Sequence, residues 1–224
     1  MTSTNDNTRD GIRIGIMVSG HGRGTNLQAI IDACSEGAVP GEVAVVIGTR
    51  SDAPALARAQ SAGIKTVVIS PRKYEQDEKG YAEAILRVLD GGGVGLICLA
   101  GYMRMLPLPV VERFRDRIMN VHPALLPLFG GQGMYGENVH RAVIESGMKL
   151  SGATVHFVDE HYDAGPIIHQ LAVPVKDSDT PETLAARVLR AEHQAYTEAI
   201  RWFAEGRLYV EGRRVRVLAE EDNG

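Results

Sequence analysis

The sequence has few cysteines and no long apolar run, and both shortages exclude classes of protein. Its two cysteines, Cys34 and Cys98, lie in apolar stretches without the spacing of a metal site, which favours a reducing compartment. No apolar run approaches the roughly 18 residues of a membrane span, and no signal peptide is apparent. The sequence therefore predicts a cytoplasmic protein that contacts no membrane.

Strong charge of one sign is also missing. The net charge is -4, so the chain lacks the basic field with which proteins bind nucleic acids. Hydrophobic residues make up 44% and charged residues 23%, which is ordinary for a globular protein with a buried core. A length of 224 residues suits one large domain. The expected partners are small molecules rather than nucleic acid or membrane.

Apolar strand patterns alternate with amphipathic helix patterns through the first half of the chain. Strands are expected at 11–18, 42–48, 65–69 and 94–100, and helices at 27–35, 53–62 and 81–89. Asp52 is expected to cap the second of these helices. Such alternation predicts a Rossmann-like α/β fold, with a doubly wound, mostly parallel sheet and helices on both faces.

The second half continues the pattern and ends in a hairpin. Strands are expected at 117–121, 151–158 and 167–175, helices at 137–146 and 180–204, and a hairpin near 208–217. Thr180 is the predicted cap of the long helix, because Pro181 follows at its first position. The expected organisation is a flexible tail at 1–11, one domain at 12–210 and a C-terminal hairpin and tail at 211–224.

Asn120 and His122 are the first candidate site residues. They lie two apart at the end of a short strand that stops before Pro123, so both side chains point to one face. Ligands of open α/β sheets bind at the carboxyl ends of strands. An amide can donate to an oxyanion, and an imidazole can carry a proton near neutral pH. The alternative is that both side chains satisfy only local backbone groups.

A glycine-rich turn at 19–26 joins the first strand to the first helix. This arrangement gathers free backbone N–H groups at a helix N-terminus, where a phosphate can bind. Gly24, Thr25 and Asn26 are the candidate contacts. The turn matches neither the Walker pattern nor the dinucleotide fingerprint, and a plain connector is an equal alternative.

Four further features leave alternatives open. The turn at 101–107 is either a hydrophobic plug or the wall of a pocket for a flat heteroaromatic ligand. The loop at 129–136 has the glycine content of a mobile cover. His156 shares a strand face with Thr154 and is either catalytic or, more commonly for such a histidine, a hydrogen-bonded structural partner. Asp163 lies in an acidic turn whose carboxylates are typically solvated.

Taken together, these segments resemble the formyltransferases that use 10-formyltetrahydrofolate. Within them, the chain is most similar to the phosphoribosylglycinamide formyltransferase family of purine biosynthesis. The most specific match is Asn120-Val121-His122-Pro123-Ala124-Leu125-Leu126-Pro127. Further matches are 24–28, 100–106, 152–158, 163–168, 192–193 and 202–208, so that the resemblance runs from about residue 12 to residue 208.

The resemblance implies an activity and a set of site residues. It implies transfer of the formyl group of 10-formyltetrahydrofolate, a co-substrate, to the amine of phosphoribosylglycinamide, without a metal and by a monomer or homodimer. Asn120 and a protonated His122 would stabilise the oxyanion, while Asp163 would raise the pKa of His122 and assist proton transfer. The other implied contacts are Met103, Arg104, Met105 and Leu106 for the folate, Gly24, Thr25 and Asn26 for the phosphate, and Glu192 for the ribose region.

Two departures from the family pattern and three rival functions remain. The glycine turn is longer than usual, and the loop after Pro127 is extended, with Leu128 where a basic residue is common.

A formyltetrahydrofolate deformylase would normally carry an extra N-terminal domain, and a methionyl-tRNA formyltransferase a basic C-terminal domain. A non-catalytic nucleotide-binding module would have no reason to combine Asn120, His122 and Asp163.

Overall fold

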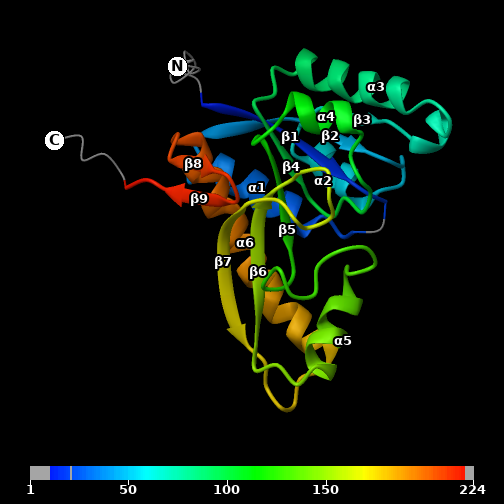
Figure 1. Cartoon of the computed structure of the whole chain (residues 1–224). Coiled ribbons are helices and arrows are strands. Elements are labelled where there is room, and N and C mark those ends of the chain that lie inside the picture. The colour runs from blue at the N-terminus through cyan, green and yellow to red at the C-terminus, as the bar shows by residue number, and fades with distance from the viewer. Residues whose placement is uncertain (1–10, 21, 220–224) are drawn as a thin grey trace.

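The computed structural model describes residues 11–20 and 22–219, and nearly all of the predicted N-terminal tail lies outside them. Nine strands of the described residues form one sheet in the order β3-β2-β1-β4-β5-β6-β7-β9-β8 (Figure 1). They are β1 (Ile12–Val18), β2 (Gly41–Gly48), β3 (Thr66–Val68), β4 (Leu96–Leu99), β5 (Ile118–His122), β6 (Leu150–Phe157), β7 (Ile167–Pro174), β8 (Leu208–Glu211) and β9 (Arg214–Val217).

Helices cover both faces of this sheet, as predicted. They are α1 (Thr25–Ser35), α2 (Pro54–Ser61), α3 (Glu78–Gly91), α4 (Leu108–Arg113), α5 (Glu137–Glu145) and α6 (Pro181–Ala204), with a 3-10 turn, η1, at Pro71–Tyr74. One apolar cluster packs α1, α2 and α6 against the sheet, and a second packs α3 and α4 against the opposite face. The doubly wound α/β architecture is therefore confirmed.

Alternation along β1 shows how the sequence specifies the two layers. Ile14, Ile16 and Val18 belong to the cluster beneath α1 and α6, whereas Met17 belongs to the cluster beneath α3. Because successive strand residues face opposite sides, a strand buried on both faces needs a nearly continuous apolar run. The run in β1 supplies both halves of the core.

Strand directions set the geometry of the site. Strands β1 to β5 are parallel, whereas β6 pairs antiparallel with β5 and β7 antiparallel with β6. Strand β7 pairs parallel with β9, so the sheet is mostly parallel, as predicted, with antiparallel pairs in its second half. The antiparallel register places His156 of β6 directly opposite Asn120 of β5. The centre of the sheet, where β1 neighbours β4, is the switch point at which the strand order reverses, and ligands of such sheets typically bind there.

The predicted cap of α2 is wrong. Helix α2 has Ala53 as its N-cap without a side-chain hydrogen bond, and Pro54 at its first position. The carboxylate of Asp52 accepts instead two hydrogen bonds from the Arg50 guanidinium, at 2.8 and 2.6 Å. A bidentate, charge-assisted pair is stronger than a single hydrogen bond to a neutral backbone N–H. The Asp52 carboxylate therefore pairs with Arg50 instead of capping the helix.

Other helix termini agree better with the sequence. Thr180 caps α6 in a reciprocal capping box with Thr183, as the sequence predicts. Helix α3 begins at Glu78 and not at 81, because the Asp77 side chain accepts from the Gly80 N–H at 2.8 Å. The short elements α4 and η1 were not predicted.

The C-terminal hairpin is present and extends the sheet. Strands β8 and β9 pair antiparallel around Gly212, and β9 pairs with β7 at Ile167 and Arg214. No helix in the described part of the chain is long and apolar enough to cross a membrane.

Candidate active site

The side chains of Asn120 and His122 lie at the carboxyl end of β5, next to the central switch point. Asn120 is half-buried and His122 is buried. Beyond them, Thr154 of β6 fixes the turn that follows β5: its hydroxyl donates to the Ala124 carbonyl at 2.6 Å and accepts from the Leu126 N–H at 3.0 Å. A rigid turn of this kind limits the freedom of the strand end that carries the candidate residues.

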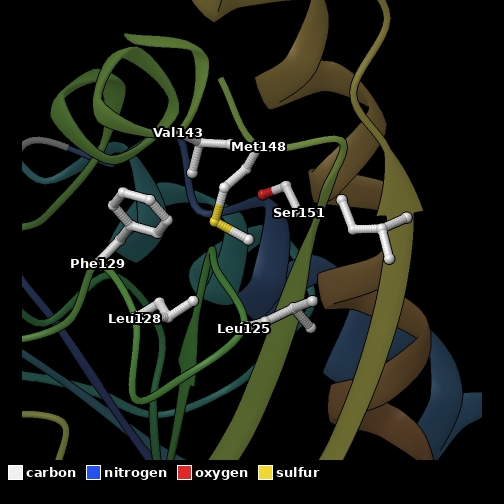
Figure 2. Close-up of a pocket in the computed structure, with 7 residues that line it drawn as sticks. Leu125, Leu128, Phe129, Val143, Met148 and Ser151 are labelled. Carbon is white, nitrogen blue, oxygen red and sulfur yellow. The ribbon is translucent and has the colours of Figure 1, made fainter. Parts of the chain in front are cut away.

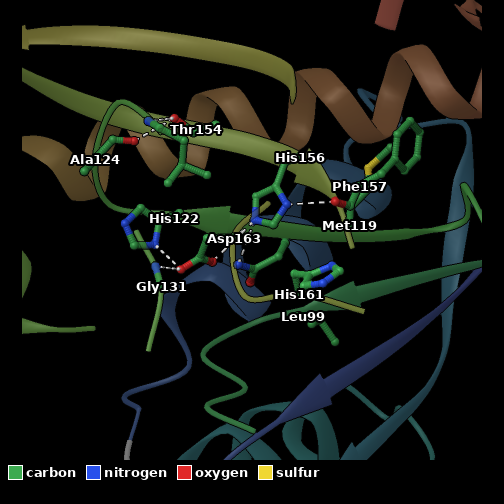
Figure 3. A network of polar contacts seen from close by, with 12 residues as sticks. Leu99, Met119, His122, Ala124, Gly131, Thr154, His156, Phe157, His161 and Asp163 are labelled. Carbon is green, nitrogen blue, oxygen red and sulfur yellow. Dashed lines mark hydrogen bonds and ion pairs between the residues drawn. The ribbon is translucent and has the colours of Figure 1, made fainter. Parts of the chain in front are cut away.

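The carboxylate of Asp163 lies between two imidazoles (Figure 3). One oxygen is 3.5 Å from Nδ1 of His122, and the other is 3.6 Å from Nε2 of His156. Asp163 has a left-handed backbone, with φ of 52°, which aims its side chain back at β5 and β6. The structure therefore brings Asn120, His122 and Asp163 together and adds His156, whose surroundings agree with the structural alternative.

A chain of hydrogen bonds fixes the orientation of the Asn120 amide. Nδ1 of His156 is 2.8 Å from the Phe157 carbonyl, which can only accept, so Nδ1 carries the proton. Nε2 of a neutral His156 then accepts from Nδ2 of Asn120 at 3.3 Å. The second hydrogen of the Asn120 amide remains available for a ligand. His156 thus orients the amide of Asn120, the candidate oxyanion donor, a contact that the register of β5 and β6 reveals but composition does not.

Both ring nitrogens of His122 face acceptors. Nε2 is 2.8 Å from the Phe129 carbonyl, and Nδ1 faces Asp163. Burial nevertheless lowers the pKa of His122 below 6.5, against the opposing effects of Asp163 and the Phe129 carbonyl. The expected effect of Asp163 is therefore present, but desolvation of the imidazolium outweighs it and sets the net direction of the shift.

At Asp163, contacts with neighbouring groups outweigh the effect of burial on the pKa. Burial alone would raise its pKa, but the facing His156 ring, the hydrogen bond from the Gly131 N–H and the charge interaction with His122 together hold the pKa below 3.8. The Gly131 N–H donates to a carboxylate oxygen at 2.9 Å. Asp163 is consequently a carboxylate at neutral pH and supplies a negative charge next to His122.

The glycine-rich loop at 129–136 contacts these catalytic candidates through its backbone. The Phe129 carbonyl accepts from His122, and the Gly131 N–H donates to Asp163. Between them, Gly130 approaches so closely that an added Cβ would lie 2.6 Å from Leu126 Cδ2 and 3.2 Å from Asp163 Cβ. The loop therefore lies directly over the site, as expected of a cover.

The predicted phosphate contacts lie at the N-terminus of α1. Gly24 is its N-cap, with φ of 72° and no side-chain cap, and a Cβ there would lie 2.9 Å from the Ala55 Cα. Thr25 and Asn26 form the first helical turn, two residues earlier than predicted. Their N–H groups face outward from a helix terminus that carries partial positive charge.

Glu192 of α6 meets this turn. Nδ2 of Asn26 donates to its Oε2 at 2.8 Å, so two of the predicted substrate contacts are joined across 166 residues of sequence. Burial raises the pKa of Glu192, partly offset by this hydrogen bond. A buried carboxyl beside the turn predicted to bind phosphate can accept hydrogen bonds from hydroxyl groups of a bound ligand.

The predicted folate segment borders a cleft of about 390 Å³. Arg104, Met105 and Leu106 line it, whereas Met103 does not. Within the described residues, no hydrogen bond uses the backbone N–H groups of Arg104, Met105 or Leu106. The remaining lining residues, which the sequence did not indicate, are Pro71, Arg72, Tyr74, Glu75, Glu78, Tyr81 and Pro107.

A second cavity lies under the start of the glycine-rich loop (Figure 2). Its volume of about 10 Å³ admits at most one water molecule, so it cannot hold a substrate. The lining is apolar except for Ser151 and consists of Leu125, Leu128, Phe129, Val143, Met148, Leu150 and Ser151. The described residues also contain no group of three or more His, Cys, Asp or Glu side chains placed to hold a metal ion.

Comparison with known proteins links this geometry to a family. Residues 12–200 match the family described as formyl transferase. The chloroplastic phosphoribosylglycinamide formyltransferase of Arabidopsis thaliana is 42% identical over 211 residues, covering 94% of this chain and 72% of the relative. The solved glycinamide ribonucleotide transformylase 1 of Symbiobacterium toebii is 49% identical with a TM-score of 0.88, covering 97% and 100%. A Pseudomonas syringae formyltetrahydrofolate deformylase, 24% identical with a TM-score of 0.79 and covering 95% and 67%, shares the fold.

Proposed function

The chain belongs to the formyl transferase family, and on that basis we propose that it transfers the formyl group of 10-formyltetrahydrofolate to the amine of phosphoribosylglycinamide. The products are formylglycinamide ribonucleotide and tetrahydrofolate, a step of de novo purine biosynthesis. One observation carries the assignment of the site: an amide, an imidazole and a carboxylate from two separate segments converge at Asn120, His122 and Asp163. No nucleophilic side chain is required.

The reaction begins with attack of the neutral amine on the formyl carbon. A carbon–nitrogen bond forms and the carbonyl electrons move to oxygen, which gives a tetrahedral oxyanion. The amide hydrogen of Asn120 that His156 leaves free donates to this oxygen. A single preorganised donor of this kind lowers the barrier by roughly 3–4 kcal/mol.

His122 is the second donor once the loop has moved. In the described conformation its Nε2 donates to the Phe129 carbonyl, so the formyl oxygen has to replace that carbonyl. The negative charge that develops on the formyl oxygen beside Nε2 raises the pKa of His122 and opposes the effect of burial. Asp163 on the other side of the ring favours the imidazolium in the same way.

Asp163 assists the proton transfer that completes the reaction. The attacking nitrogen becomes positively charged, and even a weakly basic carboxylate can accept its proton. The bond between the formyl carbon and N10 of the folate then breaks, and N10 receives the proton. Atoms and charges balance without an additional reactant.

The two substrates reach this cluster from either side of the switch point. The ribonucleotide phosphate binds the N–H groups of Gly24, Thr25 and Asn26, with Glu192 toward the ribose. The folate occupies the cleft lined by Arg104, Met105 and Leu106, whose free backbone N–H groups match the polar edge of a pterin. Arg72 and Arg104 line the same cleft and can pair with the glutamate carboxylates of the folate.

The proposed function is tested by following folate product by absorbance, with and without phosphoribosylglycinamide. Product that forms only with the ribonucleotide supports the transferase. Equal product without it would identify the protein as a deformylase, in which water replaces the amine. No product from folded protein in either case would favour the nucleotide-binding module.

Two further predictions accompany this proposal. A cytoplasmic location stays a prediction, and the Arabidopsis thaliana relative is named as chloroplastic. The choice between a monomer and a homodimer also stays open to measurement, for which sedimentation of the full chain is the direct experiment.

A further inference from the structure

Ser19 joins the two substrate-binding segments. It is the first residue after β1, at the start of the glycine turn, and only 6% of it is exposed. Its N–H donates to the Gly101 carbonyl at 3.3 Å, and its hydroxyl oxygen accepts from the Met103 N–H at 2.9 Å. One buried serine therefore contacts the segment proposed to bind folate and begins the turn proposed to bind phosphate.

The folate segment has few other attachments. It is neither helix nor strand from Gly101 to Pro107, and Gly101 has φ of 71°. The Tyr102 hydroxyl, buried against α3, lies 3.2 Å from the hydroxyl of Tyr81. Leu106, buried in the apolar cluster beneath α3 and α4, anchors the end of the segment, whereas Ser19 supplies the hydrogen bonds of Gly101 and Met103 at its start.

The adjacency of β1 and β4 at the switch point explains how the Ser19 hydroxyl reaches the folate segment. Strands β1 and β4 are neighbours, and the turns that follow them leave the sheet side by side. A hydroxyl at the end of β1 can reach the backbone that follows β4. The orientation of Met103 N–H toward Ser19 leaves the next three N–H groups directed elsewhere and unpaired within the described residues.

From these contacts we propose that Ser19 is a positioning residue that couples ribonucleotide binding to folate binding. The proposal rests on the proposed function, because it names both ligands of that site. A phosphate bound to the glycine turn restrains Ser19, and Ser19 restrains the folate segment through Met103. By thermodynamic linkage, each ligand then raises the affinity for the other by the same factor.

Replacing Ser19 by alanine tests the proposal. The variant loses the only acceptor that the described residues offer to the Met103 N–H. We expect the KM for formyl folate to rise about tenfold, in line with loss of one buried hydrogen bond, while kcat changes little. Ser19→Thr keeps the hydroxyl and should restore most of the affinity. Ser35→Ala, which removes a serine hydrogen bond at the opposite end of α1, is the matched control.

Coupling is measured with an unreactive pair of ligands. Tetrahydrofolate is titrated by calorimetry with and without saturating phosphoribosylglycinamide. Neither ligand carries a formyl group, so no reaction takes place during the titration. In the unaltered protein the ribonucleotide should tighten folate binding, and in Ser19→Ala the ratio should fall toward one. An unchanged ratio, or an unchanged KM, overturns the proposal.

Failure of this inference is distinguishable from failure of the proposed function. If the unaltered protein shows no ribonucleotide-dependent formyl transfer, the function itself is wrong. If it transfers formyl groups while Ser19→Ala and Ser35→Ala behave alike in KM and coupling, only the role of Ser19 is wrong. A parallel fall of kcat, both KM-derived affinities and melting temperature in Ser19→Ala and Ser19→Thr would also overturn it, because that pattern indicates a general packing defect.

Discussion

At Asp163, one side chain acts on two neighbours because its oxygens face different imidazoles. The carboxylate contacts His122 through one oxygen and His156 through the other, and the Gly131 N–H donates to it as well. Replacing the charge without changing the shape separates these functions. Asparagine is suitable because, like aspartate, it tolerates the left-handed backbone found at this position.

We expect Asp163→Asn to lower kcat far more than it raises either KM. The amide can neither accept the amine proton nor favour an imidazolium at His122, and loss of general acid–base assistance typically costs about 10²–10⁴-fold in rate. Steady-state kinetics with both substrates measure the effect. Asp159→Asn, in the same turn, is the control, because its carboxylate accepts from the His161 N–H. A turnover number unchanged by Asp163→Asn would contradict the assigned role.

Ser151 is a residue whose removal should stabilise the protein. Its hydroxyl is buried next to the small apolar cavity and has no hydrogen-bond partner among the described residues. An unsatisfied buried hydroxyl costs about 1–3 kcal/mol, so Ser151→Ala should raise the free energy of unfolding by about 1 kcal/mol.

The contrasting variant is Ser146→Ala. That hydroxyl donates to the Val143 carbonyl at 2.7 Å, and its loss should lower the free energy of unfolding. Urea denaturation of both variants gives the two signs directly. Destabilisation by Ser151→Ala as large as that by Ser146→Ala would show that the Ser151 hydroxyl is satisfied in solution.

At the scale of single elements, the glycine-rich loop is held against the site by close backbone approach. Gly130→Ala would place a methyl group 2.6 Å from Leu126 Cδ2 and 3.2 Å from Asp163 Cβ. The end of the Leu126 side chain can move aside, but the loop or Asp163 has to shift by a few tenths of an ångström. A displacement of a catalytic group by about 1 Å can reduce rate roughly 100-fold, so we expect kcat to fall between tenfold and a hundredfold.

Gly91→Ala is the matched control for this variant, because a Cβ there meets nothing within 4 Å. Thermal melting of both variants checks that the fold is retained. If Gly130→Ala turns over as fast as Gly91→Ala, the loop lies farther from Asp163 during catalysis than in the described conformation.

The sequence was sufficient for elements that depend on local patterns. The apolar residues at 11–18 predicted β1, and the Thr-Pro pair predicted the start of α6. Capping of α2 was mispredicted, because the Arg50 guanidinium competes for Asp52 and such competition depends on side-chain geometry. Short elements such as α4 have too few residues for a periodic signal.

The candidate site shows the same difference between features set by local pattern and features set by the folded chain. Asn120 and His122 share a strand face that spacing alone predicts, and family resemblance supplied Asp163. His156 joined the cluster only through the antiparallel register of β5 and β6, which no local pattern specifies. The sequence predicted that Asp163 raises the pKa of His122, but not that burial, a property of the folded chain, outweighs this effect.

At the scale of the whole molecule, buried histidines make stability depend on pH. Burial is the main cause of lowered pKa values at His122, His140 and His193. Below a pH of about 6.5, the pKa of an unperturbed histidine, the unfolded chain binds protons that the folded chain excludes. Asp163, whose pKa is held below 3.8, contributes stability throughout this range and loses it only in stronger acid.

We therefore expect the free energy of unfolding to fall as pH decreases from 7.5 toward 5, and to rise again when the pH is restored. The sign follows because the unfolded state binds more protons across this window, so that stability increases with pH. Urea midpoints measured at intervals of half a pH unit give the slope of stability against pH.

His140→Gln should flatten this slope, because His140 is buried near His122 and its Nδ1 has no partner within the described residues. His161→Asn should leave it unchanged, since that side chain is exposed. A slope that is equally steep in His140→Gln would locate the proton uptake at His122 and His193 instead, and a flat profile in the unaltered protein would show that burial does not lower these pKa values in solution.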